Sequence, residues 1–212
     1  MADATPLRVL GVDPGLSRCG IGIVEGSASS PRLCAHRCVR TDPAEPLEQR
    51  LLAVHTALVE VIGEFAPTAM AVEQVLFSKN VRTAMATGQA AGVALLAGAQ
   101  AGLTVAAYTP TEVKLTVAGS GTADKDGVAR MVAAQLGVVE SFGPADVTDA
   151  LAVAITHLAR SRLSRAASSP AAAETLQAAH AAAQQARRGG WEAVLGDRLA
   201  AASAPRTGRG QQ

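Results

Sequence analysis

The sequence predicts an α/β domain with a mixed five-stranded sheet and helices on both of its faces. Short apolar runs bounded by turn residues indicate five strands. Longer segments with apolar residues at helical spacing follow the third, fourth and fifth of these strands. Consecutive strands pair as hairpins, whereas strands separated by a helix need a crossover connection. The sheet should therefore start antiparallel and continue with crossover-connected strands.

The first three strands are expected over residues 7–11, 19–25 and 33–39, because turn residues separate these apolar runs. The remaining elements follow from apolar periodicity and from Pro and Gly at segment ends. They are a helix between Pro46 and Pro67, a strand over 69–75, a helix over 80–102, a strand over 103–107, a helix after Pro110, and helices over 124–136 and 146–162.

The composition changes after residue 165. We expect one domain over residues 1–165 and an Ala- and Arg-rich extension over 166–212 that is partly helical or disordered. The net charge of the 212-residue chain is +1, yet residues 160–212 carry eight Arg against three acids. The first 159 residues are therefore acidic, and a nucleic-acid surface on them must be local.

Hydrophobic residues make up 49% of the chain but aromatic residues only 2%. A core of aliphatic side chains suits tightly packed helices and strands better than a large aromatic-lined ligand cavity. No apolar stretch reaches membrane-spanning length, and the N-terminus lacks a basic region followed by an apolar core. We expect a cytoplasmic protein with no membrane partner.

Three cysteines, Cys19, Cys34 and Cys38, cannot all pair, which fits a reducing compartment. Cys34, His36 and Cys38 alternate along one strand and so resemble half of a zinc site. Zinc sites usually draw on two separated ligand pairs, and a second pair is missing from the sequence. Ordinary strand side chains are the preferred interpretation.

Two acids stand within apolar strands. Asp13 ends the run from Val9, and Glu73 lies in the run from Ala69 to Val75. A carboxylate in an apolar setting costs several kcal/mol unless a cation compensates it, and two on neighbouring strands also repel each other. A bound divalent cation would resolve both problems.

Asp146 and Asp149 are spaced i, i+3 at the start of an apolar helix, so both can face the same neighbour. Asp146 could also simply cap that helix. Together with Asp13 and Glu73, however, they form an all-oxygen ligand set that selects hard cations such as Mg²⁺ or Mn²⁺. Phosphodiester hydrolysis, with one or two such ions, is the natural chemistry. His157, two helical turns beyond Asp149, is expected to be structural.

Several short segments closely resemble the RuvC family of bacterial Holliday junction resolvases. They are Gly11-Val-Asp13-Pro-Gly15, Ala71-Val-Glu73-Gln-Val75, Gly88-Gln-Ala90, Val113-Lys114-Leu-Thr-Val117, Asp124-Lys125 and Asp146-Val-Thr-Asp149. Each is weak alone, but their order and spacing are specific. The resemblance implies a ribonuclease H-like fold, a homodimer, and paired symmetric nicks in four-way junction DNA that leave 5′-phosphate and 3′-hydroxyl ends. It also implies action with the RuvA–RuvB branch-migration complex in recombination and repair.

Carried over position by position, the resemblance places the catalytic and metal-binding acids on Asp13, Glu73, Asp146 and Asp149, with Mg²⁺ as cofactor and Mn²⁺ as a substitute. DNA contacts are expected from Lys114 and Lys125, and also from Phe77, Lys79 and Arg82. An ungapped match places Leu76 where the family has an aromatic wedge, with Phe77 one position later. Phe77 is either the wedge or a core residue.

The segment after Asn80 is rich in Ala and Gly. The resemblance places it at the dimer interface, but close packing within one subunit would explain its composition equally well.

Two other functions compete with the nuclease. The segment Gly11 to Gly15 also resembles a phosphate loop of ATP-binding proteins of the actin and sugar-kinase group, although one domain is too small to enclose a nucleotide. A non-catalytic junction-binding module is disfavoured because a phosphate-binding surface would avoid clustered carboxylates.

Overall fold

The sheet has five strands in the order β3-β2-β1-β4-β5 within the described part of the chain. The computed structural model describes residues 6–74, 81–139 and 142–167, with side chains as far as residue 161. β2 pairs antiparallel with β1 and with β3, whereas β4 runs parallel to β1 and β5 parallel to β4. The predicted mixed sheet is confirmed. The strands are β1 (Leu7–Asp13), β2 (Arg18–Ser27), β3 (Ser30–Arg40), β4 (Ala69–Glu73) and β5 (Thr104–Tyr108).

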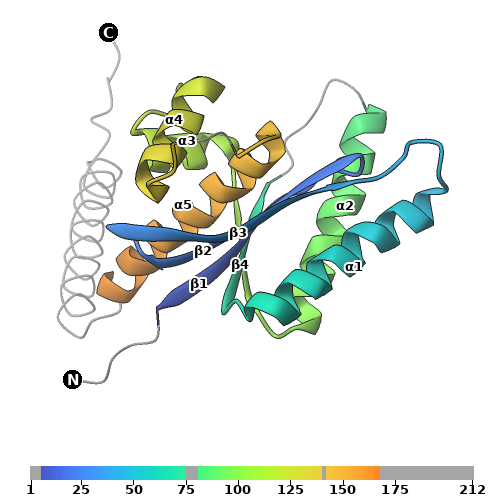
Figure 1. Ribbon diagram of the computed structural model, residues 1–212, viewed down its shortest axis with the longest axis horizontal. Helices are drawn as coiled ribbons and strands as arrows, with labels where there is room; N and C mark the ends of the chain where they lie inside the picture. Colours follow the sequence, from blue (N-terminus) through green and yellow to red (C-terminus); the bar gives the residue numbers. More distant parts are fainter. Residues whose placement is uncertain (1–5, 75–80, 140–141, 168–212) are drawn as a thin grey trace, which may run out of the picture. The chain divides into compact units, whose positions relative to one another are not determined.

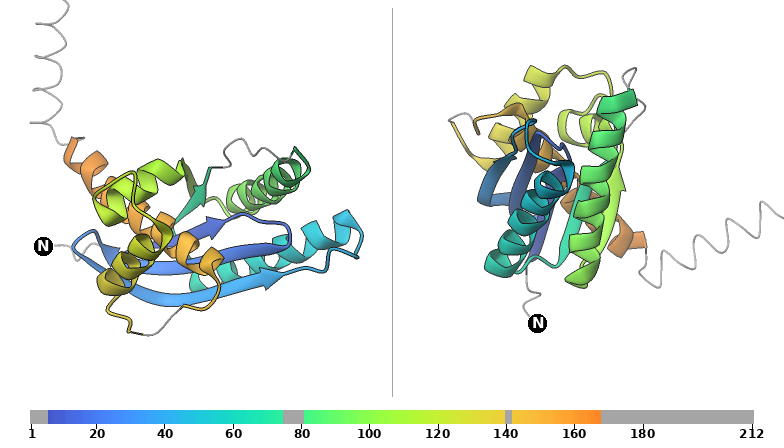
Figure 2. Two further views of the ribbon diagram at one scale, coloured as in Figure 1. Left: turned by 90° about the horizontal axis from the view of Figure 1, so that it is seen from above. Right: turned by 90° about the vertical axis from the view of Figure 1, so that its right-hand side faces the viewer.

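Helices cover both faces of the sheet, as predicted (Figures 1 and 2). Two helices pack on one face, and the last of the described helices packs on the other with two shorter helices beside it. Each face has its own hydrophobic core, because successive residues of a strand point to opposite sides. The helices are α1 (Leu47–Phe65) and α2 (Val81–Gln100) on the first face, and α3 (Pro110–Ala118), α4 (Lys125–Leu136) and α5 (Ala145–Ala167) on the second.

Helix α5 lies directly against β1 and β2 because glycines leave room for its backbone. A Cβ atom added at Gly20 would lie 1.8 Å from the backbone oxygen of Asp146, and one at Gly11 would lie 2.0 Å from that of Ala150. Real Cβ atoms do not approach so closely, so any larger residue would push α5 off the sheet. The glycines that alternate along these strands thus set the position of the first turns of α5.

The helix ends agree with their local sequence signals. Thr109 caps α3 in a reciprocal capping box with Glu112, and Pro110 occupies its first turn. Asp124 caps α4 by accepting a 2.7 Å hydrogen bond from the backbone N–H of Gly127. Predicted and observed bounds differ by three residues or fewer for most elements, but α5 extends to residue 167 rather than 162.

The described residues up to 163 belong to one compact unit. All but the first two residues of the predicted extension over 166–212 lie outside the described residues. The division at residue 165 therefore stays a prediction. No described helix has the length and apolarity needed to span a membrane.

Candidate active site

The first half of the site lies at the ends of two neighbouring parallel strands. The last register pair of β1 and β4 is Val12 with Val72, so Asp13 and Glu73 occupy the next position on each strand. Adjacent strands are about 4.8 Å apart. Ala71, two residues before Glu73, belongs to the core under α5, and alternation therefore directs Glu73 to the same face. Two acids thus lie side by side on the α5 face.

Helix α5 supplies the other two acids. Asp146 lies in its first turn, and the backbone of this residue lies over Gly20, the register partner of Asp13. Because α5 starts at Ala145, Asp146 lies in the first turn of the helix, where an acid also interacts favourably with the helix N-terminus. Asp149, one turn later, is near enough to raise the pKa of both strand acids. The four predicted acids therefore gather at one end of the sheet.

Burial and mutual repulsion perturb the strand acids strongly. Burial, followed by the negative charges of Asp149 and Asp146, raises the pKa of Asp13 to about 7. Burial, followed by the charges of Asp13 and Asp149, raises the pKa of Glu73 to about 8. Carboxyl groups that resist ionisation this strongly lack sufficient positive charge nearby. Perturbation of this kind in a cleft is typical of functional sites.

Basic side chains partly compensate these acids. Lys125 Nζ lies 3.4 Å from Asp149 Oδ2, and the Asp149 charge is the main cause of the raised pKa of Lys125. On the other side, Arg18 Nε lies 3.1 Å from Asp146 Oδ2. Nothing in the sequence pattern singles out Arg18 as a site residue. Its contact exists only because the short β1–β2 turn and α5 meet at this end of the sheet.

An open cavity of about 290 Å³ adjoins the acids. Glu73 and Asp149 contribute to its wall together with Lys114 from α3 and Lys125 from α4. Pro110, Val113 and Val128 provide apolar lining. A wall that combines carboxylates with two lysines suits a phosphodiester whose charge is shared between cations and ammonium groups. The structure thus brings both predicted lysines to the acid cluster.

The donor set suits a hard divalent cation, because carboxylate oxygens are the ligands that Mg²⁺ and Mn²⁺ prefer. A cation would also compensate the two strand acids that burial destabilises. Among the described residues, however, no three His, Cys, Asp or Glu side chains are already arranged to hold an ion. Mg²⁺ is often held by one or two carboxylates with waters and substrate oxygens, and the assignment of all four acids as ligands stays a prediction.

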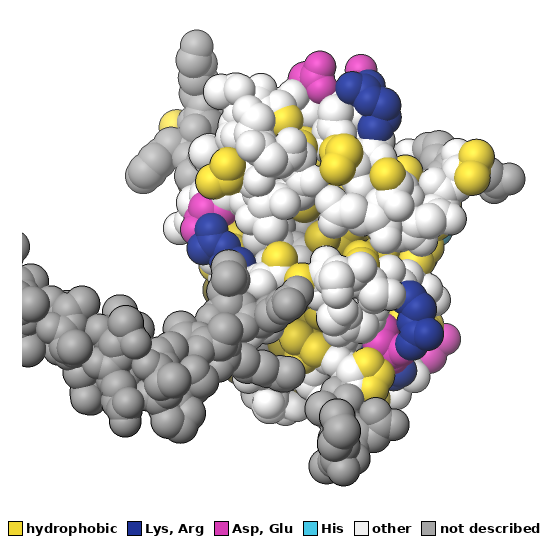
Figure 3. Space-filling view, turned by 90° about the vertical axis from the view of Figure 1, so that its left-hand side faces the viewer, with side chains coloured by type: hydrophobic (Ala, Val, Ile, Leu, Met, Phe, Trp, Pro, Cys, Tyr) yellow, Lys and Arg dark blue, Asp and Glu magenta, His cyan; other side chains and the backbone are white. Residues whose placement is uncertain are grey.

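Of the predicted DNA contacts Phe77, Lys79 and Arg82, only Arg82 lies within the described residues. Arg82 is exposed in the first turn of α2. Phe77 and Lys79, like Leu76, lie outside the described residues, so the choice of the base wedge stays open. On the face drawn in Figure 3, basic side chains lie beside acidic ones in separate groups, and no continuous basic surface is visible among the described residues.

Other polar residues have structural surroundings. His36 packs edge-on against Phe142, with ring centroids 6.0 Å apart, and Cys38 packs against the α5-side core. These are contacts of ordinary strand side chains. His157 is buried, and its Nδ1 shares a 3.0 Å hydrogen bond with the hydroxyl of Tyr108, in agreement with the structural role expected of it.

Comparison with known proteins identifies the family. The family model described as RuvC, crossover junction endodeoxyribonuclease, matches residues 9–157. The chain belongs to the RuvC family. The RuvC protein of Salinispora arenicola is 48% identical over 189 residues, covering 87% of this chain and 99% of the relative. RuvC of Moorella thermoacetica is 49% identical over 151 residues, covering 71% of this chain and 90% of the relative.

Solved RuvC structures agree. Thermus thermophilus RuvC in complex with a Holliday junction substrate matches with a TM-score of 0.72 at 39% identity, covering 74% of this chain and 96% of that one. The yeast mitochondrial resolvase Ydc2 matches with a TM-score of 0.54 at 11% identity, covering 74% and 80% of the two chains, and so shares the fold. The fold is ribonuclease H-like, as the resemblance implied. RuvC membership excludes the ATP-binding alternative.

Proposed function

We propose that this protein is a metal-dependent endonuclease that resolves Holliday junctions, with Asp13, Glu73, Asp146 and Asp149 holding Mg²⁺ at the scissile phosphate. RuvC membership makes the protein a crossover junction endodeoxyribonuclease. The observation that carries the proposed site is the pair of partly buried acids at the ends of β1 and β4, facing the first turns of α5. Mn²⁺ should substitute for Mg²⁺, since both accept oxygen ligands.

The chain's own groups have distinct parts in this proposal. When bound, one or two ions would supply an activated water and charge for the leaving 3′ oxygen. Asp13 and Glu73 are held rigidly by the sheet, so they position the reaction centre. Lys125 and Lys114 line the cavity next to Glu73 and Asp149 and would bind phosphate oxygens of the cleaved strand. Hydrolysis would leave 5′-phosphate and 3′-hydroxyl ends.

Paired symmetric nicks call for two sites related by a two-fold axis, and we propose a homodimer that uses α2. One side of this helix is apolar and exposed, and its residues do not pack against the described core. We call this side the stripe. Gly88 and Gly92 lie in the middle of the stripe, and a Cβ added at either would meet nothing within 4 Å. A second helix could therefore approach closely. The stripe consists of Val81, Met85, Gly88, Gly92, Leu95, Leu96 and Ala99.

Family membership also supports proposals on cellular context. Bacterial RuvC relatives act on crossover junctions, so we propose that this protein acts in the cytoplasm, during recombination and repair, together with the RuvA–RuvB branch-migration complex. Arg82 at the start of α2, and Phe77 and Lys79 before it, are proposed to contact the junction near its crossover. These assignments rest on the family resemblance.

Cleavage of synthetic DNA tests the nuclease proposal. We expect the protein to nick a four-way junction symmetrically when Mg²⁺ is present and to leave a linear duplex of the same sequence intact. With EDTA, cleavage should stop. Equal cutting of both substrates, or cutting without any divalent cation, would contradict the proposal.

The oligomeric state tests the role of α2. Leu96→Asn places a polar amide in the exposed stripe and should shift the protein from dimer to monomer in sedimentation velocity experiments. Leu52→Asn on α1 is a matched control, since Leu52 is similarly exposed, at 56% against 53% for Leu96. A wild-type protein that is monomeric at micromolar concentration would refute the dimer.

A further inference from the structure

Two arginines face each other across β2 and β3 at the active-site end of the sheet. Arg18, the first residue of β2, is the register partner of Arg40, the last residue of β3. Directly opposed residues of antiparallel strands have Cβ atoms about 5 Å apart. Like charges on directly opposed residues are unfavourable unless anions compensate them, and Asp146 forms an ion pair only with Arg18 of these two.

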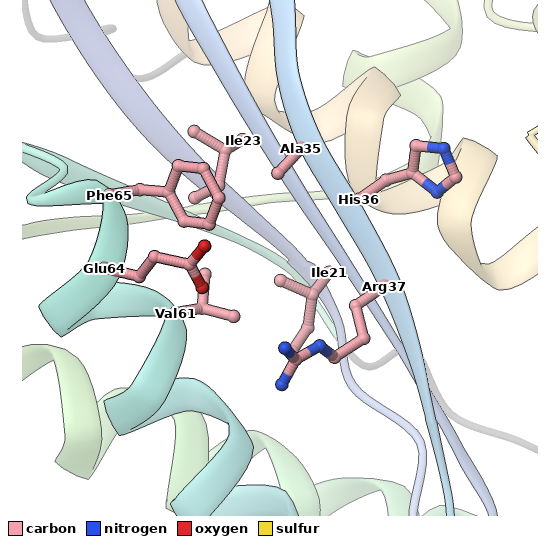
Figure 4. Close-up of a pocket in the computed structure, with 8 residues that line it drawn as sticks. All are labelled: Ile21, Ile23, Ala35, His36, Arg37, Val61, Glu64 and Phe65. Carbon is pink, nitrogen blue, oxygen red and sulfur yellow. The ribbon is translucent and has the colours of Figure 1, made fainter.

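Both arginines lie on the same face of the sheet as the four acids. Figure 4 shows His36 and Arg37 of β3 on opposite sides of the sheet, with Arg37 directed toward α1. His36 instead contacts Phe142 on the α5 side. Because side chains alternate along a strand, Arg40 shares the side of His36. Arg18 lies on the α5 side as well, since its Nε contacts Asp146.

The pair retains unused hydrogen-bonding capacity. The Nε of Arg18 contacts Asp146 Oδ2, and the Arg18 side chain is still 62% exposed. A guanidinium carries five N–H donors, so several remain available. Arg40 is exposed, and no carboxylate among the described residues forms an ion pair with it. The charge of Arg40 therefore has no partner within the described protein.

The order of the strands places this pair on the opposite side of the acids from Lys114. Along the strand order, the arginines stand on β3 and β2, and the strand acids follow on β1 and β4. Lys114 comes next, on α3 directly after β5. Positive charge thus flanks the acids on both sides. A DNA strand that crosses the metal site has phosphates on either side of the cut that the metal does not neutralise. Positive side chains on both sides of the acids suit such a strand.

We propose that Arg18 and Arg40 together bind a backbone phosphate of the cleaved strand, next to the scissile phosphate and on the side away from Lys114. The phosphate would separate the two like charges and accept hydrogen bonds from both guanidinium groups, a geometry that suits arginine better than lysine. The contact is independent of base sequence and fixes the position of the strand over the acids. This inference rests on the proposed nuclease function.

Junction binding without cleavage tests the proposal. We would measure affinity in EDTA over a range of salt concentrations for the wild type, Arg40→Gln and Arg37→Gln. Arg40→Gln should weaken binding about tenfold and reduce the slope of log affinity against log salt by about 1. Arg37→Gln removes the same charge from the same strand, but on the α1 face, where Arg37 pairs with Glu60. This control should bind as the wild type does.

Single neutral linkages then locate the contact. A methylphosphonate would replace each phosphate near the cut in turn. At one position next to the cut, the wild type should lose as much affinity as Arg40→Gln loses on unmodified DNA, and Arg40→Gln should lose little more. Identical binding and salt dependence of Arg40→Gln and Arg37→Gln would overturn the proposal. A wild-type protein that neither binds nor cuts junctions would instead overturn the proposed function.

Discussion

The two faces of the sheet are built from the same strands but serve different ends. On the α1/α2 face, β1 and β2 present large side chains such as Leu10 and Ile21, which fill a hydrophobic core. On the α5 face, the alternate positions hold Gly11 and Gly20, and β1 ends in Asp13. Large side chains keep the backbones of α1 and α2 away from the sheet, whereas the glycines let the backbone of α5 contact it. This close packing of α5 brings its two acids, Asp146 and Asp149, to Asp13 and Glu73 on the sheet.

The largest effect should come from removing a strand acid. Asp13→Asn keeps the size of the side chain but removes the charge that would hold a cation, so we expect junction cleavage to fall by about 10³-fold or more. Junction binding in EDTA should change little. Single-turnover cleavage measures the loss, and Glu60→Gln on the α1/α2 face is the control. Near-normal cleavage by Asp13→Asn would contradict the assignment of the catalytic site to the α5 face.

Closing the gap under α5 should have the next largest effect. In Gly20→Ala, the new Cβ would collide with the backbone of Asp146, and the helix must shift. We expect a loss of about 3 kcal/mol in the free energy of unfolding, measured by urea denaturation. Gly63→Ala is the control, because a Cβ there meets nothing within 4 Å and alanine favours the helix. Equal stability of both variants would contradict the direct contact between α5 and the sheet.

The acids should also make the metal-free protein sensitive to pH. The folded-state pKa of Asp13 is raised to about 7 from 3.8, so this carboxyl stays protonated in the folded protein at pH values where the unfolded chain is ionised. Stability from this group is present at low pH and is lost as the pH rises through 7. Between pH 5 and 8.5, the wild type should lose roughly 2 kcal/mol more than Asp13→Asn.

Urea denaturation in EDTA at both pH values measures this difference. Adding Mg²⁺ at pH 8.5 should restore stability to the wild type more than to Asp13→Asn, because the ion compensates the buried charge. Glu60→Gln, which removes a 59% exposed carboxylate from the α1/α2 face, should behave as the wild type. Parallel pH profiles for the wild type and Asp13→Asn would argue against an unfavourably buried Asp13.

The smallest effect should come from the polar contact deeper on the α5 face. Tyr108→Phe removes the hydroxyl that bonds His157 Nδ1 but keeps the ring over which Arg160 lies, 5.6 Å from the ring centroid. We expect a loss of about 1 kcal/mol in unfolding free energy. Tyr108→Leu removes both contacts and should cost more. A Tyr108→Phe variant as stable as the wild type would show that this hydrogen bond does not contribute to the free energy of unfolding.

Much of the fold follows from local pattern. Alternation in β2, periodicity in α1 and the capping signals at Thr109 and Asp124 each depend on neighbours along the chain, so the elements and most of their bounds are predictable. Asp13 and Glu73 are recognisable because an acid in an apolar strand is costly wherever the strand lies. The C-terminal end of α5 was underestimated, because apolar periodicity fades beyond residue 160 while the helix continues.

The sequence by itself determined the mixed sheet, the two strand acids and the i, i+3 pair on α5, since each is a property of one segment. Only the tertiary structure decided that Arg18 contacts Asp146, that Lys125 contacts Asp149, and that the Asp13 carboxyl resists ionisation. Ion pairs and pKa values depend on the distance between charges and on their exclusion from water. Both quantities are set by how distant segments pack, which no local pattern contains.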